Sequence, residues 1–196
     1  MSEADRPILN IRGELVALGP IRRDLIPAYQ RWMNDFGTTR TLAIQPRPMT
    51  LDQENAWFES ATLAEEPAFT IFELATGRPI GNCGAHEVDF RNRRAEVGIV
   101  IGEPDARGRG YGTEAMRLLL DYLFTALGLH SVMLLTYEYN LAARRCYEKV
   151  GFRETGRRRE CRWFAGRFWD EITMDILEGE FESPVLRGVL IPDEEQ

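Results

Sequence analysis

The chain has 196 residues, of which 44% are apolar, and its 24 Lys and Arg residues against 31 Asp and Glu residues give a formal net charge of -7. This length and composition are typical of one globular domain with a sizeable core. The acidic balance argues against a general binder of nucleic-acid phosphates, which needs a basic surface, and it suits a cationic substrate.

Segments that would target or anchor the chain are not evident. Residues 1–7 are polar and lack the apolar core of a signal peptide, and no run reaches the roughly 20 apolar residues of a membrane span. Cys83, Cys146 and Cys161 are odd in number, well separated and without CxxC spacing, which favours reduced thiols packed as small apolar side chains over a metal site or a catalytic cysteine. We therefore expect a cytoplasmic protein without a structural metal.

The first half of the chain predicts a strand, two helices and a hairpin. An apolar stripe of 3.6-residue period marks the first helix, and Thr50 with Gln53 forms a capping box that opens the second. The strand is expected over 15–18, the first helix over 22–36, a loop over 45–49, the second helix from Thr50, and the two strands of the hairpin over 68–74 and 80–88.

The second half predicts a parallel crossover followed by another hairpin. A nearly continuous apolar run suggests that the strand over 95–101 is buried on both faces, and a glycine-rich loop joins it to a helix that Gly128 caps. The helix is expected over 113–127, the next strand over 131–137, a short helix over 140–149, the closing strands over 152–162 and 167–177, and an edge strand or dimer contact within the tail, 178–196.

Gly108, Gly110 and Gly112 lie at alternate positions where the buried strand turns into the helix. The missing side chains let backbone N–H groups converge on an anion at the helix N-terminus, so the expected ligand is a phosphate. The spacing is neither the Walker A pattern, which needs a following Lys-Ser/Thr, nor the dinucleotide-binding GxGxxG pattern.

Two motifs at the ends of this crossover resemble those of the GNAT acetyltransferases. Arg107-x-x-Gly110-x-Gly112 matches the family's Arg/Gln-x-x-Gly-x-Gly/Ala pattern, and Asn140-x-x-Ala143-x-x-x-Tyr147-x-Lys149-x-Gly151-Phe152 is similar to its later Asn and Tyr segment. The resemblance covers roughly residues 12–177. It is strongest to the branch with ribosomal-protein N-terminal acetyltransferases of the RimJ/RimL type and spermidine acetyltransferases, whose last hairpin resembles Gly166-Arg167-Phe168-Trp169-Asp170.

The resemblance implies an α/β (α+β) fold in one domain, residues 1–177, with a mixed, mostly antiparallel sheet splayed at a site for acetyl-coenzyme A. Val100 and Ile101 would pair with the pantetheine arm through their backbones, and Asn140, with Ala143 in the same motif, would bond the arm from the other side. The pyrophosphate would be held by the loop residues Arg107, Gly108, Arg109, Gly110, Tyr111, Gly112 and Thr113.

Acetyl transfer to an amine needs a proton acceptor and a proton donor. Tyr147 is the donor candidate, because a phenol of pKa about 10 can protonate a departing thiolate whose conjugate acid has a pKa of about 8.5. Glu96 is the leading acceptor, directly or through water, because a carboxylate in an apolar strand is unexpected unless it faces a polar cleft. Glu138 and a chain of water molecules are the alternatives.

Recipients in the resembling branch are primary amines, namely protein N-termini, polyamines and amino sugars, and the sequence selects none of them. Two other hypotheses stay open. One is a sensor that binds acyl-coenzyme A without catalysis. The other is an RNA- or ribosome-binding module that uses the basic and aromatic residues of 157–167. A homodimer through the tail is a further expectation.

Overall fold

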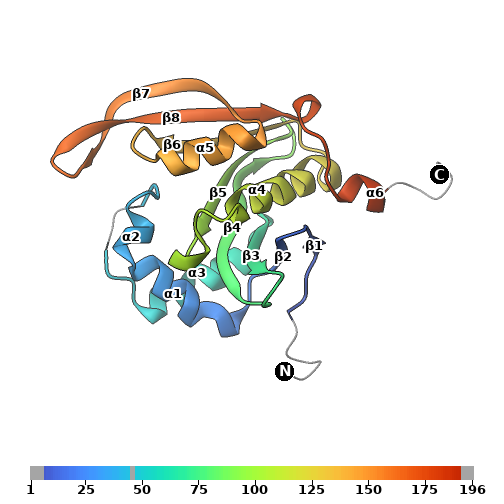
Figure 1. Cartoon of the computed structure of the whole chain (residues 1–196), viewed down its shortest axis with the longest axis horizontal. Helices are drawn as coiled ribbons and strands as arrows, with labels where there is room; N and C mark the ends of the chain where they lie inside the picture. The colour runs from blue at the N-terminus through green and yellow to red at the C-terminus, as the bar shows by residue number, and fades with distance from the viewer. Residues whose placement is uncertain (1–6, 45–46, 191–196) are drawn as a thin grey trace.

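The computed structural model describes residues 7–44 and 47–190, which form an eight-stranded sheet with helices on both faces (Figure 1). The strand order is β1-β2-β3-β4-β5-β6-β8-β7, and every pair of neighbours is antiparallel except β5 with β6. The strands are β1 (Ile11–Arg12), β2 (Val16–Pro20), β3 (Ala68–Glu73), β4 (Pro79–Asp89), β5 (Arg94–Ile101), β6 (Ser131–Tyr137), β7 (Arg153–Phe164) and β8 (Arg167–Leu177). The mixed, mostly antiparallel α/β sheet confirms the predicted fold class.

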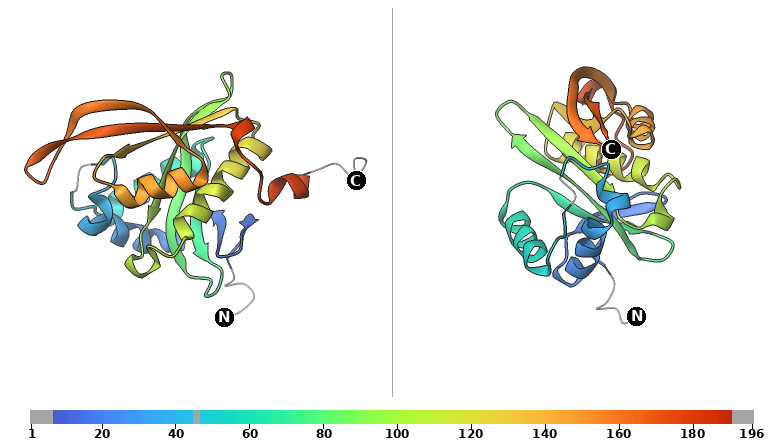
Figure 2. Two further views of the ribbon diagram at one scale, coloured as in Figure 1. Left: turned by 45° about the horizontal axis from the view of Figure 1, so that its top comes forward. Right: turned by 90° about the vertical axis from the view of Figure 1, so that its left-hand side faces the viewer.

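Two helical layers enclose the sheet (Figure 2). On one face, α4 and α5 contribute to the main core, which includes Met116, Leu119 and Val150. On the other face, α1 and α3 pack through a smaller cluster centred on Tyr29, Trp32 and Phe58. The helices are α1 (Ile26–Asn34), α2 (Phe36–Thr39), α3 (Leu51–Leu63), α4 (Tyr111–Asp121), α5 (Leu141–Val150) and α6 (Leu186–Leu190). Within the described residues, no helix is long and apolar enough to cross a bilayer.

The crossover from β5 through α4 to β6 is parallel, as predicted, but the two strands pair only at their beginnings. The register joins Arg94 to Ser131, Ala95 to Val132 and Glu96 to Met133, and no later pair follows. Beyond that point β5 stays paired with β4 as far as Ile101, while β6 stays paired with β8 as far as Tyr137. The sheet therefore splays after Glu96.

Helix α1 holds the outer end of β5. A Cβ on Gly102 would lie 2.2 Å from the Trp32 ring, so the indole packs directly on the backbone at this glycine. The Trp32 Nε1–H also donates to Glu103 Oε1 at 2.8 Å. Because the end of β5 is bound to α1 and β4, it does not follow β6.

Three sequence expectations are corrected. The first helix is broken at Asp35, whose carboxylate accepts from Gly37 N and Thr38 Oγ1 and so starts α2 in a new direction; Phe36 is consequently exposed. The end of β5 is not buried on both faces, because the splay leaves Gly98 exposed and residues 99–101 partly exposed.

The third correction concerns the tail, where no edge strand forms within 178–190. The buried Asp121 carboxylate accepts hydrogen bonds from the backbone N–H groups of Val185 and Leu186 and from the Ser183 hydroxyl, and so it starts α6. Ile191 and the rest of the tail lie outside the described residues, as do Gln45 and Pro46 of the predicted loop.

Other local predictions are confirmed. Thr50 and Gln53 form a reciprocal capping box at α3. Gly128 and Gly151 adopt left-handed conformations, with φ of 65° and 119°, after the helical segments that they end. The closing hairpin turns at Ala165 and Gly166, both with positive φ.

Candidate active site

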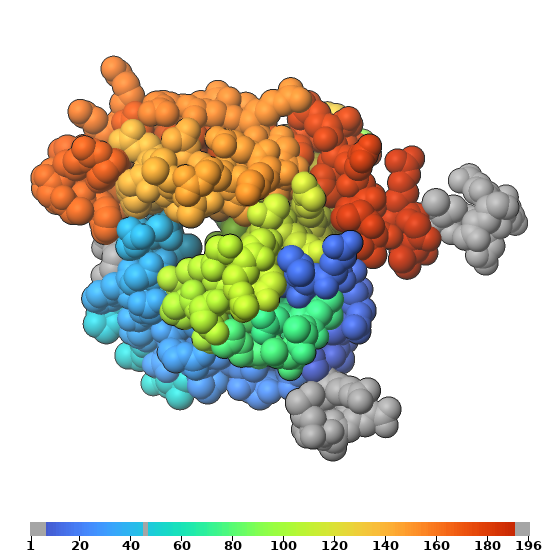
Figure 3. All heavy atoms as spheres, viewed as in Figure 1, coloured from blue at the N-terminus to red at the C-terminus, as the bar shows by residue number. Residues whose placement is uncertain are grey.

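A cavity of about 550 Å³ opens where β5 and β6 part, and we call it the splay cavity. It is bounded by the end of β5, the loop before α4, the beginning of α5 and the segment 37–43. Figure 3 shows its mouth as an opening between this blue segment, the yellow-green loop and the orange α5. Nine of the predicted cofactor residues line it: Val100, Ile101, Arg107, Gly108, Gly110, Gly112, Thr113, Asn140 and Ala143.

The glycine loop turns into α4 through two left-handed residues, Gly108 with φ of 72° and Gly110 with φ of 88°. A Cβ would meet nothing at Gly108, so the backbone conformation and not crowding requires glycine there. The first N–H groups of α4 have no partner within the helix and carry its positive end. Because Arg145 and Lys149 also line this cavity, the loop has the chemistry that a phosphate needs.

Arg109 and Tyr111 do not line the splay cavity. The Tyr111 hydroxyl donates to Glu73 Oε1 at 2.6 Å, and the Arg109 guanidinium lies 3.6 Å from the same carboxylate. Hydrogen bonds from Thr76 and Tyr111 hold the pKa of Glu73 below its ordinary value, so it stays ionised. These two side chains therefore anchor the loop to β3.

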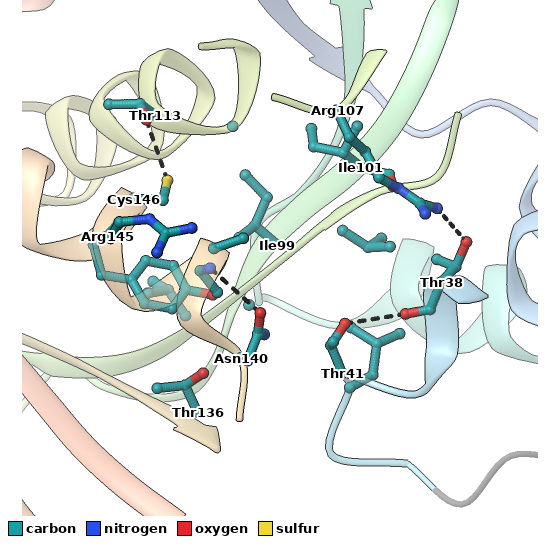
Figure 4. Close-up of a pocket in the computed structure, with 18 of the residues that line it drawn as sticks. Thr38, Thr41, Ile99, Ile101, Arg107, Thr113, Thr136, Asn140, Arg145 and Cys146 are labelled. Atoms are coloured by element: carbon teal, nitrogen blue, oxygen red, sulfur yellow. Dashed lines mark hydrogen bonds between the residues drawn. The ribbon is translucent and has the colours of Figure 1, made fainter. Parts of the chain in front are cut away.

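The Arg107 guanidinium spans the cavity wall from β5 to α2 (Figure 4). It donates to Thr38 Oγ1 at 2.5 Å and to the carbonyl oxygens of Ile101 and Gly102 at 3.1 and 3.2 Å. Most of its donors are thus engaged by the protein. In this conformation the side chain holds the wall in place and only the backbone of Arg107 belongs to the anion-binding loop.

Helix α5 and its N-cap bring four residues of the second motif to the cavity: Asn140, Ala143, Tyr147 and Lys149. Asn140 caps the helix by accepting from Ala143 N at 3.3 Å, and Thr113 Oγ1 donates to Cys146 Sγ at 3.3 Å, which ties α4 to α5 (Figure 4). Burial raises the pKa values of Cys146 and Cys83, so both thiols stay protonated at neutral pH. A protonated thiol is a poor nucleophile, so neither cysteine has the state that a nucleophile requires.

Tyr147 lines the splay cavity with only 8% of the residue exposed, and its ring packs edge-on against Phe152. Burial raises the pKa of its phenol above the ordinary value, so the hydroxyl remains protonated well above neutral pH. A protonated phenol at this position has the state that a proton donor requires.

Glu96 also lines the splay cavity, and it has a partner that the sequence analysis missed. His86 lies opposite it in the β4–β5 register, with Nε2 3.1 Å from Glu96 Oε1. The Glu96 side chain is 19% exposed and the His86 side chain 47%, so the pair faces the cavity with access to water. A register shift between His86 and Asp89 decides this pairing, and no local pattern reveals such a shift.

Glu138, the alternative proton acceptor, does not line the splay cavity. It accepts from the backbone N–H of Asp170 and lies 3.5 Å from Arg157, which also contacts Glu154 and Asp170. Arg162 donates to Ile44 O, and the Arg167 guanidinium stacks on Trp169. These three arginines of the segment 157–167 are therefore engaged within the chain.

The long β7–β8 hairpin closes one side of the site. Tyr139 stacks between Tyr137 and Phe164, with ring centroids 5.4 and 5.1 Å away, and its hydroxyl donates to Arg40 O. The hairpin is thereby fixed to the segment 37–43 that borders the cavity.

An open mixed sheet that parts beside a glycine loop at a helix N-terminus is the architecture expected of a coenzyme A-dependent acetyltransferase. A family model described as an acetyltransferase (GNAT) domain matches residues 16–153. The chain therefore belongs to the GNAT family of N-acetyltransferases.

Several relatives have specific names. Spermidine N(1)-acetyltransferase of Escherichia coli K12 is 33% identical over 166 residues, which cover 85% of this chain and 88% of the relative. The putative ribosomal N-acetyltransferase YdaF of Bacillus subtilis is 32% identical over 56% of this chain and 59% of its own length. Two further matches, to an uncharacterized N-acetyltransferase p20 of Bacillus licheniformis and to the Vibrio cholerae spermidine N(1)-acetyltransferase, span 63% and 64% of those proteins.

The same fold occurs in solved structures. The crystal structure of spermidine N-acetyltransferase from Vibrio cholerae in complex with CoA and spermine has a TM-score of 0.79 and 25% identity to this chain. The matched region covers 86% of this chain and 98% of the chain in that structure. The relatives thus extend the resemblance over nearly the whole described fold.

The glycine loop provides a test of the cofactor site. Replacing Gly108 by Ala places a residue with a side chain at a left-handed backbone conformation, at a cost of about 1–2 kcal/mol, and adds a Cβ atom to the loop. We expect Gly108→Ala to weaken acetyl-coenzyme A binding about tenfold or more by isothermal titration calorimetry. Gly128→Ala, with a similar φ at the far end of the same helical segment and equally open space, should lose similar stability but no affinity. Equal affinity losses in both variants would contradict the assignment.

Proposed function

We propose that this chain transfers the acetyl group of acetyl-coenzyme A to a primary amine within a ternary complex. The observation that carries the proposal is the splay cavity, which has an anion-binding loop at one side and brings Glu96, His86 and Tyr147 to the same space. Relatives named spermidine and ribosomal N-acetyltransferases support an amine as the acceptor. The free thiols of Cys83, Cys146 and Cys161 suit a reducing compartment, and we place the activity in the cytoplasm.

The residues present fit acetyl-coenzyme A as the acetyl donor. The loop of Arg107, Gly108, Arg109, Gly110, Tyr111, Gly112 and Thr113 would hold the pyrophosphate through its backbone. Arg145 and Lys149 would add positive charge beside it. Because pairing of β5 with β6 stops at Glu96, the edge of β5 that faces away from β4 has no strand partner at Val100 and Ile101 and would be open to the pantetheine arm, apart from the Ile101 carbonyl oxygen, which accepts from Arg107. Asn140 lies across the gap.

The proposed chemistry forms a C–N bond to the acetyl carbon and breaks its C–S bond. The amine must first lose a proton, and the Glu96–His86 pair would accept it directly or through water. The departing thiolate must gain a proton, and the Tyr147 hydroxyl, which burial keeps protonated, would supply it. The two proton transfers run in opposite directions, and in this proposal two separate groups carry them out.

A thiol-release assay tests the function itself. Acetyl-coenzyme A and the purified chain are mixed with single amines from four groups: polyamines, apolar monoamines, amino sugars and peptides with free N-termini. Amine-dependent release of free thiol, with an acetylated product seen by mass spectrometry, is the expected result. Binding of acetyl-coenzyme A without release for any amine would favour the non-catalytic sensor.

The role of Tyr147 predicts a specific pH profile. Because its pKa is raised, the donor stays protonated as the pH rises, and kcat should show no alkaline decline from this group below about pH 10. Tyr147→Phe should lower kcat by about 100-fold, the usual magnitude for losing an acid catalyst, with little change in KM for acetyl-coenzyme A. Tyr122→Phe is the control and should keep full turnover, because this tyrosine packs against the main core and does not line the splay cavity. Full turnover by Tyr147→Phe would remove the assignment.

The Glu96–His86 pair is tested by a double-mutant cycle. Glu96→Gln and His86→Gln should each lower kcat/KM by about 10- to 1000-fold, and the double variant should be little worse than the poorer single variant, because the two groups act as a unit. Glu138→Gln is the control. Because Glu138 does not line the splay cavity, this variant should change kcat/KM less than twofold. Strict additivity of the two single effects would show that the groups act independently.

A further inference from the structure

A second cavity, of about 410 Å³, lies on the α3 side of β4 and β5, and we call it the α3-side cavity. It shares five lining residues with the splay cavity: Leu42, His86, Gly98, Ile99 and Val100. The two spaces thus meet at β5, beside the Glu96–His86 pair. Building on the proposed function, we propose that this cavity holds the acceptor and selects a primary amine carried by a compact apolar group, rather than a polyamine.

At its centre, the floor of the α3-side cavity is formed by glycine residues, which have no side chains. Residues of β4 and β5 alternate between the two faces of the sheet, so Gly84 and its register partner Gly98 lie on the same face as the neighbouring pair His86 and Glu96. A Cβ on Gly98 would meet only His86 Cε1, at 4.0 Å. Open space above Gly98 therefore leads directly to the proposed proton acceptor.

The wall of the cavity is mostly apolar, although Glu66 and Asn82 also line it. Helix α3 contributes Trp57 and Ala61, Ala64 follows the helix, and Leu42 and Phe69 add to the lining from the α2–α3 segment and β3. Trp57 is 40% exposed, and its ring meets Tyr29 edge-on at 5.8 Å, which fixes the indole beside the cavity. An aromatic or branched aliphatic group would gain contact with this wall by leaving water.

The charges along the two cavities favour a monoamine. Among the described residues that line them, the carboxylates are Glu66 and Glu96, and Glu96 is already paired with His86. The remaining charged lining residues are cationic: Arg40 lies on the segment 37–43, and Arg107, Arg145 and Lys149 lie on the cofactor side. A polyamine carries further ammonium groups beyond the reacting one. Glu66 is the one carboxylate among the described lining residues left to pair with them, so every ammonium group beyond the first would lose water without a carboxylate to replace it. An amine with a single charge has no such cost.

The first measurement separates binding from catalysis. 2-Phenylethylamine and spermidine are each titrated by calorimetry into the full chain saturated with coenzyme A, and both are then assayed with acetyl-coenzyme A. We expect 2-phenylethylamine to bind and to have a kcat/KM at least tenfold above that of spermidine. Equal or greater kcat/KM for spermidine, or no binding of 2-phenylethylamine, would overturn the proposal. Binding of 2-phenylethylamine without acetylation of any amine would support the cavity assignment and refute the proposed function.

Two variants locate the effect. Trp57→Ala should raise KM for 2-phenylethylamine about tenfold or more and leave KM for acetyl-coenzyme A unchanged, whereas Trp163→Ala, at the exposed tip of the β7–β8 hairpin, should change neither. Ala61→Glu, which places a carboxylate on the wall, should lower kcat/KM for 2-phenylethylamine and raise it for spermidine. Unchanged amine preference in both Trp57→Ala and Ala61→Glu, with folding verified by circular dichroism, would place the acceptor elsewhere.

Discussion

The separation of β5 from β6 after three residue pairs is the constraint on which the rest of this structure depends. Each strand keeps its other neighbour beyond that point. The end of β5 is bound to β4 and packed under the Trp32 indole, and the end of β6 is paired with β8 as far as Tyr137. Because separate partners hold the two ends, the gap between them is part of the fold.

The gap divides the site into two chemically different halves. On the side of α4 and α5 are the glycine loop, the positive end of α4 and the cationic side chains, which together suit phosphate groups. On the side of α3 the lining is mostly apolar. Glu96, His86 and Tyr147 line the space between the two halves, so the proposed proton-transfer groups lie where an acetyl donor from one side and an acceptor from the other would meet.

Several charged residues that seem functional in the sequence instead fix the walls of the site. Arg107 ties β5 to α2, Arg109 and Tyr111 attach the loop to β3, and Arg157 gathers Glu138 and its acidic neighbours on the hairpin. Glu114 holds the segment that enters β2 in place, because its carboxylate accepts hydrogen bonds from the backbone N–H groups of residues 14–16. Rigid walls keep the reacting groups at fixed distances, which is what acyl transfer between two bound molecules requires.

The sequence alone determined most of the helices and strands and the positions of both motifs, because capping boxes, glycine caps and apolar periodicity act through contacts a few residues apart. It also predicted Glu96 and Tyr147 as candidates, from a carboxylate in an apolar strand and a tyrosine in a motif. Only the tertiary structure decided that His86 faces Glu96, that Arg107 turns to Thr38, and that Trp57 and Gly98 border one cavity. The physical reason is that strand register, the bulge after His86 and the packing of α3 depend on residues far apart in the chain.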